Sequence, residues 1–205
     1  MIYKHKNVTF EFTRGDLTSD TSLNKEQIID AIYAKVDTYM KEKKLTKSNI
    51  WQVVQIFDMD GTYVLEEAIK QGDTKGFMYS ETDISCKDTS KIRDRNAHKS
   101  EMMDYLLEQD KVRGIDYKCY FMSSNLDHAL YNELNLTDKE KEAYANNFYA
   151  LFDGSEKLFV DFLKSDVVNG CPDSFTQSWQ YIKEQLQSLE RHTNLHIYFN
   201  ENPYL

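Results

Sequence analysis

Two aspartates separated by a single residue carry the clearest chemical signal in the sequence. Asp58 and Asp60 follow the apolar run 50–57 and are themselves followed by Gly61 and Thr62. Alternate residues of an extended chain share a side, so the two carboxylates lie close together and repel each other unless a cation separates them. Such oxygens suit Mg²⁺ or Mn²⁺, which leave other positions for water and substrate phosphates. We therefore predict a metal site for phosphate chemistry, and the alternative is an ordinary Asp-Gly turn that closes a strand.

A third acidic ligand would have to come from another segment. Glu11 lies in the alternating stretch 8–12, which predicts a strand, and Asp16 follows the glycine that breaks this stretch. We expect one of these two acids to join Asp58 and Asp60 around the metal.

A second group of candidates follows the apolar run 117–122. Ser123 and Asn125 stand where this predicted strand ends, and we expect both to bind phosphate. His128 lies in the short helix predicted over 126–134, where it could act as a general base or a metal ligand. The alternative for His128 is an ordinary surface residue.

The only basic cluster of the chain lies at the start of a predicted helix. Its members are Lys91, Arg93, Arg95, His98 and Lys99. Arginine presents a planar fork of donors and helix N-termini attract anions, so the cluster could clamp a phosphate, with Arg95 and Lys99 as the best candidates. The alternative is a solvated run of charge that is balanced by neighbouring acids.

These residues need a scaffold, and the hydrophobic pattern predicts one. Helical spacing of apolar residues indicates an amphipathic helix over 25–44, with Asn24 and Gln27 as a capping box. This helix lies between the predicted strands 8–12 and 50–57. The order predicts a right-handed βαβ unit with parallel strands.

The remaining elements are less regular. Residues 65–97 are polar and predict an irregular excursion with a short helix over 65–70. A helix that starts at Asn96 or Ser100 and ends at Gly114 should then lead into the strand at 117–122. The predicted elements of the last third are a helix capped by Thr137 with Glu140, a helix capped by Ser155, a long helix over 175–189 and a short strand at 196–199.

The whole pattern predicts a single α/β domain over residues 1–205. We expect three layers and a short, mainly parallel sheet in the βαβ part at 1–135, with a mostly helical part at 136–205. In such sheets ligands bind beyond the carboxyl ends of the strands, and Asp58 and Ser123 both stand at such ends.

Composition limits the binding partners and the cellular compartment that can be expected. A net charge of -9 argues against binding nucleic acid over the whole surface, although the basic cluster could hold a nucleic acid or a small phosphorylated ligand locally. No apolar run approaches the roughly 20 residues of a membrane span, and the N-terminus shows no signal-peptide core. Three widely spaced cysteines without a CxxC pair predict free thiols and a cytoplasmic protein.

The acidic turn resembles the first motif of the haloacid dehalogenase-like phosphatases. Residues 57–62, Phe-Asp-Met-Asp-Gly-Thr, match that motif residue by residue. The resemblance implies Asp58 as nucleophile, Asp60 as general acid/base and Ser123 as the second motif. Two departures stand against it. No lysine followed by a strand with paired acids is found downstream, and about fifty residues precede the motif, which usually opens the family's fold.

The order of elements resembles a second family, the TOPRIM-like proteins, especially their RloB and abortive-infection branch in phage defence. A strand with a glutamate, a helix, a strand that ends in Asp-x-Asp and a later Ser-Asn turn that enters a helix occur here in that order, over about 135 residues. The resemblance implies Mg²⁺-dependent nuclease chemistry. One departure is that Arg14, not a glutamate, precedes Gly15, so Glu11 or Asp16 would have to substitute. The Asp-x-Asp-Gly and Ser-x-Asn-Leu-Asp-His turns are also similar to those of uncharacterised small proteins of low-GC bacteria.

Three function classes follow from these residues. The first is a Mg²⁺-dependent phosphoester hydrolase, nuclease-like and acting in phage defence, which could need a partner protein. The second is a phosphatase with Asp58 as nucleophile. The third is a non-catalytic protein that binds a basic partner through its acidic surface. For the first class we expect Asp58→Asn and Asp60→Asn to weaken metal binding while the stability of the metal-free protein stays equal or rises.

Overall fold

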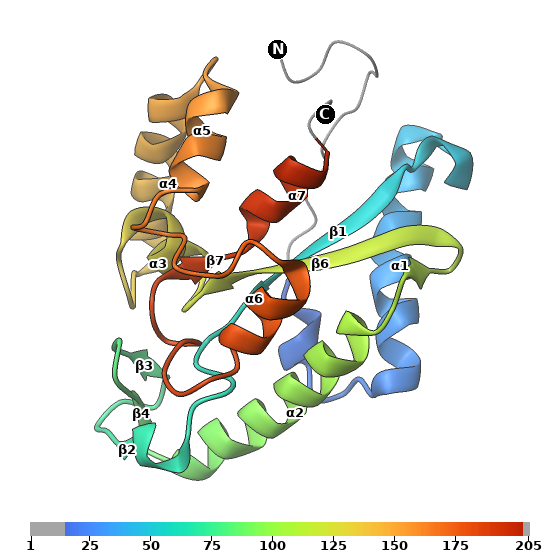
Figure 1. The fold of residues 1–205 in the computed structure, drawn as a ribbon. Helices are drawn as coiled ribbons and strands as arrows, with labels where there is room; N and C mark the ends of the chain where they lie inside the picture. Colours follow the sequence, from blue (N-terminus) through green and yellow to red (C-terminus); the bar gives the residue numbers. More distant parts are fainter. Residues whose placement is uncertain (1–14, 203–205) are drawn as a thin grey trace.

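Two long parallel strands form the centre of the structure (Figure 1), a computed structural model that describes residues 15–202. β1 and β6 pair from Gln52 opposite Asp116 to Asp58 opposite Met122. β5 and β7 pair antiparallel with the other edge of β6, near its start and its end respectively. The strands of this sheet are β1 (Gln52–Asp58), β5 (Lys111–Val112), β6 (Ile115–Ser123) and β7 (His192–Thr193). Because β1 and β6 are parallel, their last residues, Asp58 and Ser123, lie at the same end of the sheet.

Alternate residues of β6 pack into two different clusters, as expected for a strand that is covered on both faces. Cys119 and Phe121 join residues of α1, α2 and α6, whereas Tyr120 and Met122 join residues of α3, α5 and α7. The helices are α1 (Lys25–Lys43), α2 (Thr89–Leu107), α3 (Leu126–Tyr131), α4 (Asp138–Phe152), α5 (Glu156–Leu163), α6 (Phe175–Tyr181) and α7 (Leu195–Glu201).

Two of the predicted helix caps are confirmed. Asn24 and Gln27 form a reciprocal capping box at α1, and Thr137 and Glu140 form another at α4. Each cap satisfies backbone N–H groups that the first turn of a helix leaves without partners. Ser155 also precedes α5 as predicted, although its side chain makes no capping hydrogen bond.

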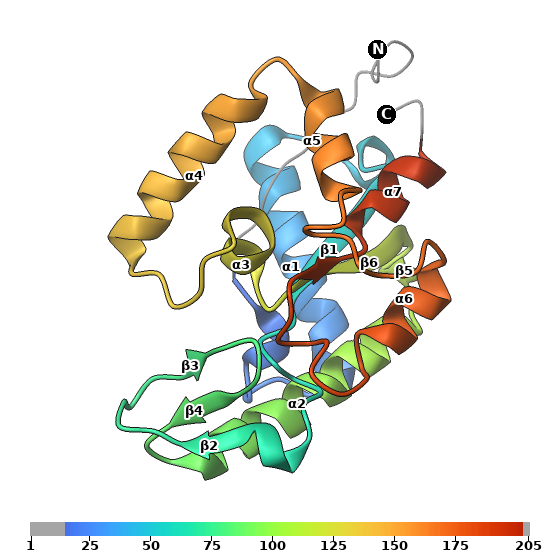
Figure 2. The ribbon, with the colours of Figure 1, turned by 60° about the vertical axis from the view of Figure 1, so that its left-hand side comes forward.

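The segment predicted to be irregular forms a small second sheet instead. A short 3-10 helix, Glu66–Ala68, replaces the predicted helix over 65–70 and leads directly into the first strand. The strands are β2 (Ile69–Gln71), β3 (Met78–Tyr79) and β4 (Ile84–Cys86), in the order β2-β4-β3. Buried Ile84 and Cys86 of β4 pack against Ile92 of α2 and against Leu189. The small sheet thus lies beside α2, at the end of the molecule away from α4 and α5 (Figure 2).

α2 begins earlier and ends earlier than predicted. Its N-cap is Asp88, whose side chain accepts a hydrogen bond from the backbone N–H of Ser90, so the helix starts before both Asn96 and Ser100. It ends at Leu107, and Gly114 (φ 86°) instead forms the turn between β5 and β6. The basic cluster, predicted at a helix start, therefore lies within α2.

Three predictions for the later helices were wrong. α3 stops at Tyr131, because Asn132 turns into the left-handed conformation (φ 60°). α6 is much shorter than the predicted helix over 175–189, and the chain turns after it through Gln185 at φ 46°. Residues 196–199, predicted as a strand, lie in α7.

The α/β class is confirmed. The described strands pair in both directions, so the mainly parallel sheet stays a prediction, as do the three layers and the single domain. Glu11 and the predicted strand 8–12 lie outside the described residues. Within 15–202, no helix has both the length and the apolar character of a membrane span.

Candidate functional site

Asp58 is the last residue of β1 and is held at the sheet edge by a backbone contact. Its Oδ1 accepts a hydrogen bond from the N–H of Leu126, the first residue of α3, at 2.8 Å. Burial and then the nearby charge of Asp60 raise the pKa of Asp58 to about 7, although Lys99 opposes the shift. The Asp58 carboxyl therefore gains or loses its proton near neutral pH.

The turn after β1 has a specific shape that other segments hold in place. Asp60 (φ 51°) and Gly61 (φ 65°) are both left-handed. The N–H of Asp60 donates to the backbone oxygen of Ser124 at 2.5 Å, and that of Gly61 donates to the backbone oxygen of Ser188 at 3.0 Å. A Cβ atom at Gly61 would lie 2.7 Å from Leu189 Cδ2, so a larger residue would be strained and would force Leu189 to shift.

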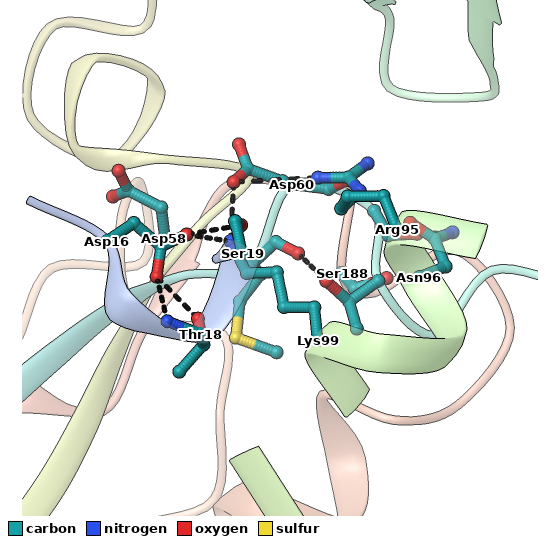
Figure 3. A network of polar contacts seen from close by, with 12 residues as sticks. Asp16, Thr18, Ser19, Asp58, Asp60, Arg95, Asn96, Lys99 and Ser188 are labelled. Carbon is teal, nitrogen blue, oxygen red and sulfur yellow. Dashed lines mark hydrogen bonds and ion pairs between the residues drawn. The ribbon is translucent and has the colours of Figure 1, made fainter. Parts of the chain in front are cut away.

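Lys99 connects two of the predicted acids. Its Nζ donates to Asp60 Oδ2 at 2.6 Å and to Asp16 Oδ2 at 2.7 Å, and its side chain is completely buried (Figure 3). Burial alone would lower the pKa of Lys99, but the charges of Asp60 and Asp16 outweigh it and raise that pKa. For Asp16, burial favours the neutral acid, but the charge and hydrogen bond of Lys99 prevail and lower its pKa to about 2. Lys99 is thus an ammonium ion between carboxylates.

Arg95 contacts the same turn from the other side. Its Nη2 donates to the backbone oxygen of Asp60 at 2.8 Å, and its Nη1 lies 3.6 Å from Asp60 Oδ2 (Figure 3). The side chain is 10% exposed, its carbon Cζ lies 5.0 Å from the ring centre of Phe77, and its buried Nε has no hydrogen-bond partner among residues 15–202. Such a donor is costly to bury unless a ligand or water satisfies it.

The structure divides the predicted basic cluster. Arg95 and Lys99 face the acidic turn. Arg93 instead pairs with exposed Glu66, the ring of His98 contacts the backbone oxygen of Asp20, and Lys91 is exposed. α2 brings Arg95 and Lys99 together because they are four positions apart and lie on one helix face.

Ser123, Asn125 and His128 are already engaged in contacts beside the turn. Ser123 Oγ donates to the backbone oxygen of Gln187, and Asn125 Oδ1 accepts from the N–H of His128 as the N-cap of α3. His128 is buried; its Nδ1 accepts from the N–H of Ser124, and its Nε2 lies 3.7 Å from Glu81 Oε1. Burial lowers the pKa of His128, which favours the neutral imidazole. Their roles toward phosphate or metal stay predictions.

The acids of the turn fit a metal ion only in part. Within 15–202 no group of three or more His, Cys, Asp or Glu residues is arranged to hold a metal. Lys99 Nζ instead contacts both Asp16 and Asp60. Asp58 and Asp60 remain as two carboxylates, the number that Mg²⁺ often uses when substrate oxygens and water complete its shell.

Two further contributors could not be found from the sequence. The phenol of Tyr79 lies beside Arg95, and burial together with the charges of Asp60 and Asp58 raises its pKa, so it stays protonated. Ser188 holds the turn at Gly61. Both belong to segments whose predicted structure was wrong, and neither belongs to a motif.

Comparisons with protein-family models, with curated proteins and with solved structures give no match for this chain. Two carboxylates at a strand end, with a buried lysine and a buried arginine beside them, can hold a cation and a phosphate side by side.

Proposed function

We propose that this protein is a Mg²⁺-dependent phosphoester hydrolase with its site at Asp58 and Asp60. The observation that carries the proposal is the position of Asp58 and Asp60 at the end of β1, with the side chains of Arg95 and Lys99 against Asp60. A divalent cation would reduce the repulsion between the Asp58 carboxylate and its neighbour Asp60. The proposal also includes a nuclease-like activity in phage defence, a cytoplasmic location and a partner protein. It includes a fold of three layers with a mainly parallel sheet.

Arg95 and Lys99 would bind the phosphate. The Arg95 guanidinium, on a side chain that is 10% exposed, would donate to a phosphate oxygen, and the ammonium of Lys99 contributes positive charge close to Asp60. Charge-assisted hydrogen bonds of this kind are the strong ones in proteins. Asp16 keeps Lys99 charged and in place.

A bound Mg²⁺ would activate a water molecule and stabilise the charge that develops on phosphate oxygens. The chain's own residues would orient the ligands of the ion and the phosphate ester. Leu126 fixes the Asp58 carboxyl, and Ser124 and Ser188 fix the turn. Arg95 would orient the ester. Because the protein offers two carboxylates without a third, Mg²⁺ should bind more tightly when a phosphate is present.

Calorimetric titration with Mn²⁺ and with Mg²⁺ tests this proposal directly. Wild type should bind either ion, whereas Asp58→Asn and Asp60→Asn should each weaken binding at least tenfold. Asp116→Asn is the matched control, since Asp116 lies at the opposite end of the same strand pair and faces Lys111. Hydrolysis of bis(p-nitrophenyl) phosphate and of p-nitrophenyl phosphate should likewise fall in Asp58→Asn and Asp60→Asn and stay unchanged in Asp116→Asn. Equal ion affinity in wild type and both variants would leave only a structural turn and would favour the non-catalytic interaction protein.

A phosphatase with Asp58 as nucleophile is the second candidate. It is favoured by the end of β6, where Ser123 stands beside the end of β1 as the second motif of the haloacid dehalogenase-like enzymes would. The Asp58 carboxylate would attack phosphorus and release the alcohol, leaving a phospho-aspartate. Borohydride reduction and mass spectrometry would then detect modified Asp58, which a water attack activated by Mg²⁺ does not produce.

A further inference from the structure

The imidazole of His128 in α3 holds the backbone that follows β6. Its Nδ1 accepts a hydrogen bond from the N–H of Ser124 at 3.0 Å, and the side chain is 2% exposed. Burial lowers the pKa of His128 and so favours the neutral ring, which alone can accept. A neutral imidazole has one proton, so acceptance at Nδ1 places that proton on Nε2. The ring therefore keeps no lone pair for a metal ion or for a substrate proton.

The segment that His128 holds contacts both aspartates of the turn after β1. The backbone oxygen of Ser124 accepts from the N–H of Asp60 at 2.5 Å. Two residues later, the N–H of Leu126 donates to Asp58 Oδ1 at 2.8 Å. His128 thus reaches the two carboxylates through residues 124–126.

The position of His128 is itself fixed by neighbours outside the turn. Arg191 Nε donates to the backbone oxygens of His128 and Ala129 at 3.0 and 3.1 Å, and the N–H of His128 donates to Asn125 Oδ1 at 2.9 Å. On the other side of the ring, Nε2 lies 3.7 Å from Glu81 Oε1, in the loop between β3 and β4. A side chain anchored in this way can determine where the Ser124 backbone lies.

We propose that His128 is a positioning residue of the Asp58–Asp60 site and acts through residues 124–126. Its Nδ1 fixes the Ser124 N–H, the Ser124 oxygen fixes the Asp60 N–H, and the same segment presents the Leu126 N–H to Asp58. Sequence reasoning suggested a general base or a metal ligand instead, and both of those roles need a free nitrogen lone pair. This inference rests on the proposed function, because the affinity that His128 would raise is that for the divalent ion.

The first test compares two substitutions of similar shape. His128→Asn places an amide oxygen where Nδ1 stands but has no counterpart of Nε2, whereas His128→Leu has the same branching without an acceptor. In calorimetric titration, His128→Asn should bind Mn²⁺ nearly as well as wild type, and His128→Leu roughly ten- to hundredfold more weakly, the usual loss when a residue that orients metal ligands is removed. His196→Leu is the matched control. His196 of α7 is similarly buried, its Nε2 faces Asp173, and its substitution should leave Mn²⁺ affinity unchanged.

The second test uses metal-free protein. In His128→Leu the N–H groups of Ser124 and Asp60 should exchange with solvent faster, relative to those in the middle of β6, because the first loses its acceptor and the second loses a fixed one. Both should stay protected in wild type, in His128→Asn and in His196→Leu. In wild type, nitrogen NMR of labelled histidine should show the His128 proton on Nε2, with the His128 signals assigned as those missing from His128→Asn.

The outcomes separate this inference from the proposed function. A loss of Mn²⁺ affinity in both His128 variants would overturn the positioning role, because Nε2 would then serve the site, and unchanged affinity in both would overturn it as well. Should His128→Leu not fold, a His128 proton on Nδ1 would overturn the inference, whereas a proton on Nε2 with Ser124 protected in His128→Asn would support it. If wild type binds no divalent ion, the hydrolase is overturned, and exchange at Ser124 and Asp60 still decides whether His128 positions the turn.

Discussion

At the scale of single residues, the site is an arrangement of charges in which each member has a different environment. Asp58 resists ionisation, Asp16 favours it, and Lys99 remains charged although it is buried. The two aspartates of the turn are therefore not equivalent. Asp60 is a counterion to Lys99, whereas Asp58 bonds to a backbone N–H, so their substitutions should have opposite effects on stability.

Asp58→Asn should stabilise the metal-free protein, and more so at higher pH. The folded protein holds the Asp58 proton up to about pH 7, whereas the unfolded chain releases it near 3.8, so ionisation costs folding free energy as pH rises between these values. Asparagine avoids this cost and keeps an oxygen for Leu126. Urea unfolding should show a stability gap that grows from pH 4 to 7, at up to roughly 1.4 kcal/mol per unit, and then levels off. A gap that does not change with pH, or one equally large in Asp116→Asn, would contradict this assignment.

Lys99→Met should destabilise the protein strongly. It leaves Asp16 and Asp60 without their buried partner, and breaking a buried ion pair from one side costs about 3–5 kcal/mol. Asp60→Asn should also destabilise, by less, because the amide oxygen can still accept from Lys99. This reverses the expectation from sequence that both turn aspartates could be neutralised without loss. Chemical unfolding measures both, and Lys91→Met, an exposed lysine of the same helix, should change little.

Sequence patterns located part of this site. Two patterns were visible in the sequence. One is the spacing of Asp58 and Asp60, and the other is the cluster of positive charge around Arg95 and Lys99 in an otherwise acidic chain. The pairing of Lys99 with Asp16 was not visible, because it joins residues 83 positions apart whose contact depends on how α2 packs against residues 16–19. Tyr79 had no signal, since a lone tyrosine in a polar segment is indistinguishable from a surface residue.

At the scale of elements, the turn after β1 depends on backbone conformation as much as on charge. Gly61 combines a positive φ with a close neighbour in Leu189, and the same glycine donates its N–H to Ser188. A strand end that must turn this sharply needs both the glycine and the segment packed over it.

Gly61→Ala should lower thermal stability, by roughly 1–3 kcal/mol at the unfolding midpoint, because it adds strain at φ 65° and a clash with buried Leu189. Gly76→Ala is the matched control: it meets no atom within 4 Å, so its effect should be neutral or slightly stabilising. Differential scanning calorimetry of both variants is the measurement. Equal melting temperatures would show that the turn can relax around a side chain.

Element prediction succeeded where apolar residues repeat and failed where structure depends on distant partners. α1 and β1 carry clear periodicity, and their positions were predicted to within a few residues. The strands of the small sheet are two or three residues long and polar, and Ile84 and Cys86 become a core only against Ile92 and Leu189. Residues 182–191 have helical spacing of apolar side chains, yet the chain turns there so that Ser188 can reach Gly61.

At the scale of the whole molecule, the segment around β7 ties the ends of the central strands together. Gln187 accepts from Ser123, Ser188 accepts from Gly61, and Asn194 Oδ1 accepts from the N–H of Phe121. Asn194 is completely buried and its amide also donates to Ser178 of α6. Both strand ends of the site thus depend on residues far away in the sequence.

Asn194→Ala should destabilise the protein by about 1–3 kcal/mol, because the buried N–H of Phe121 loses its acceptor. Hydrogen exchange should show faster exchange at Phe121 than elsewhere in β6. Asn200→Ala, at an exposed asparagine six residues further on in α7, should have little effect. Unchanged exchange at Phe121 would mean that water replaces the lost amide.

Lys99 has a practical consequence for handling the protein. Proteins whose acidic residues are held together by a structural metal lose their fold in a chelator. Here a covalently attached ammonium already compensates Asp16 and Asp60, so the protein should keep its fold in EDTA and lose only the stabilisation that a bound ion adds. Chelated protein can then be reloaded with different divalent ions, one at a time, on a scaffold that does not change between samples.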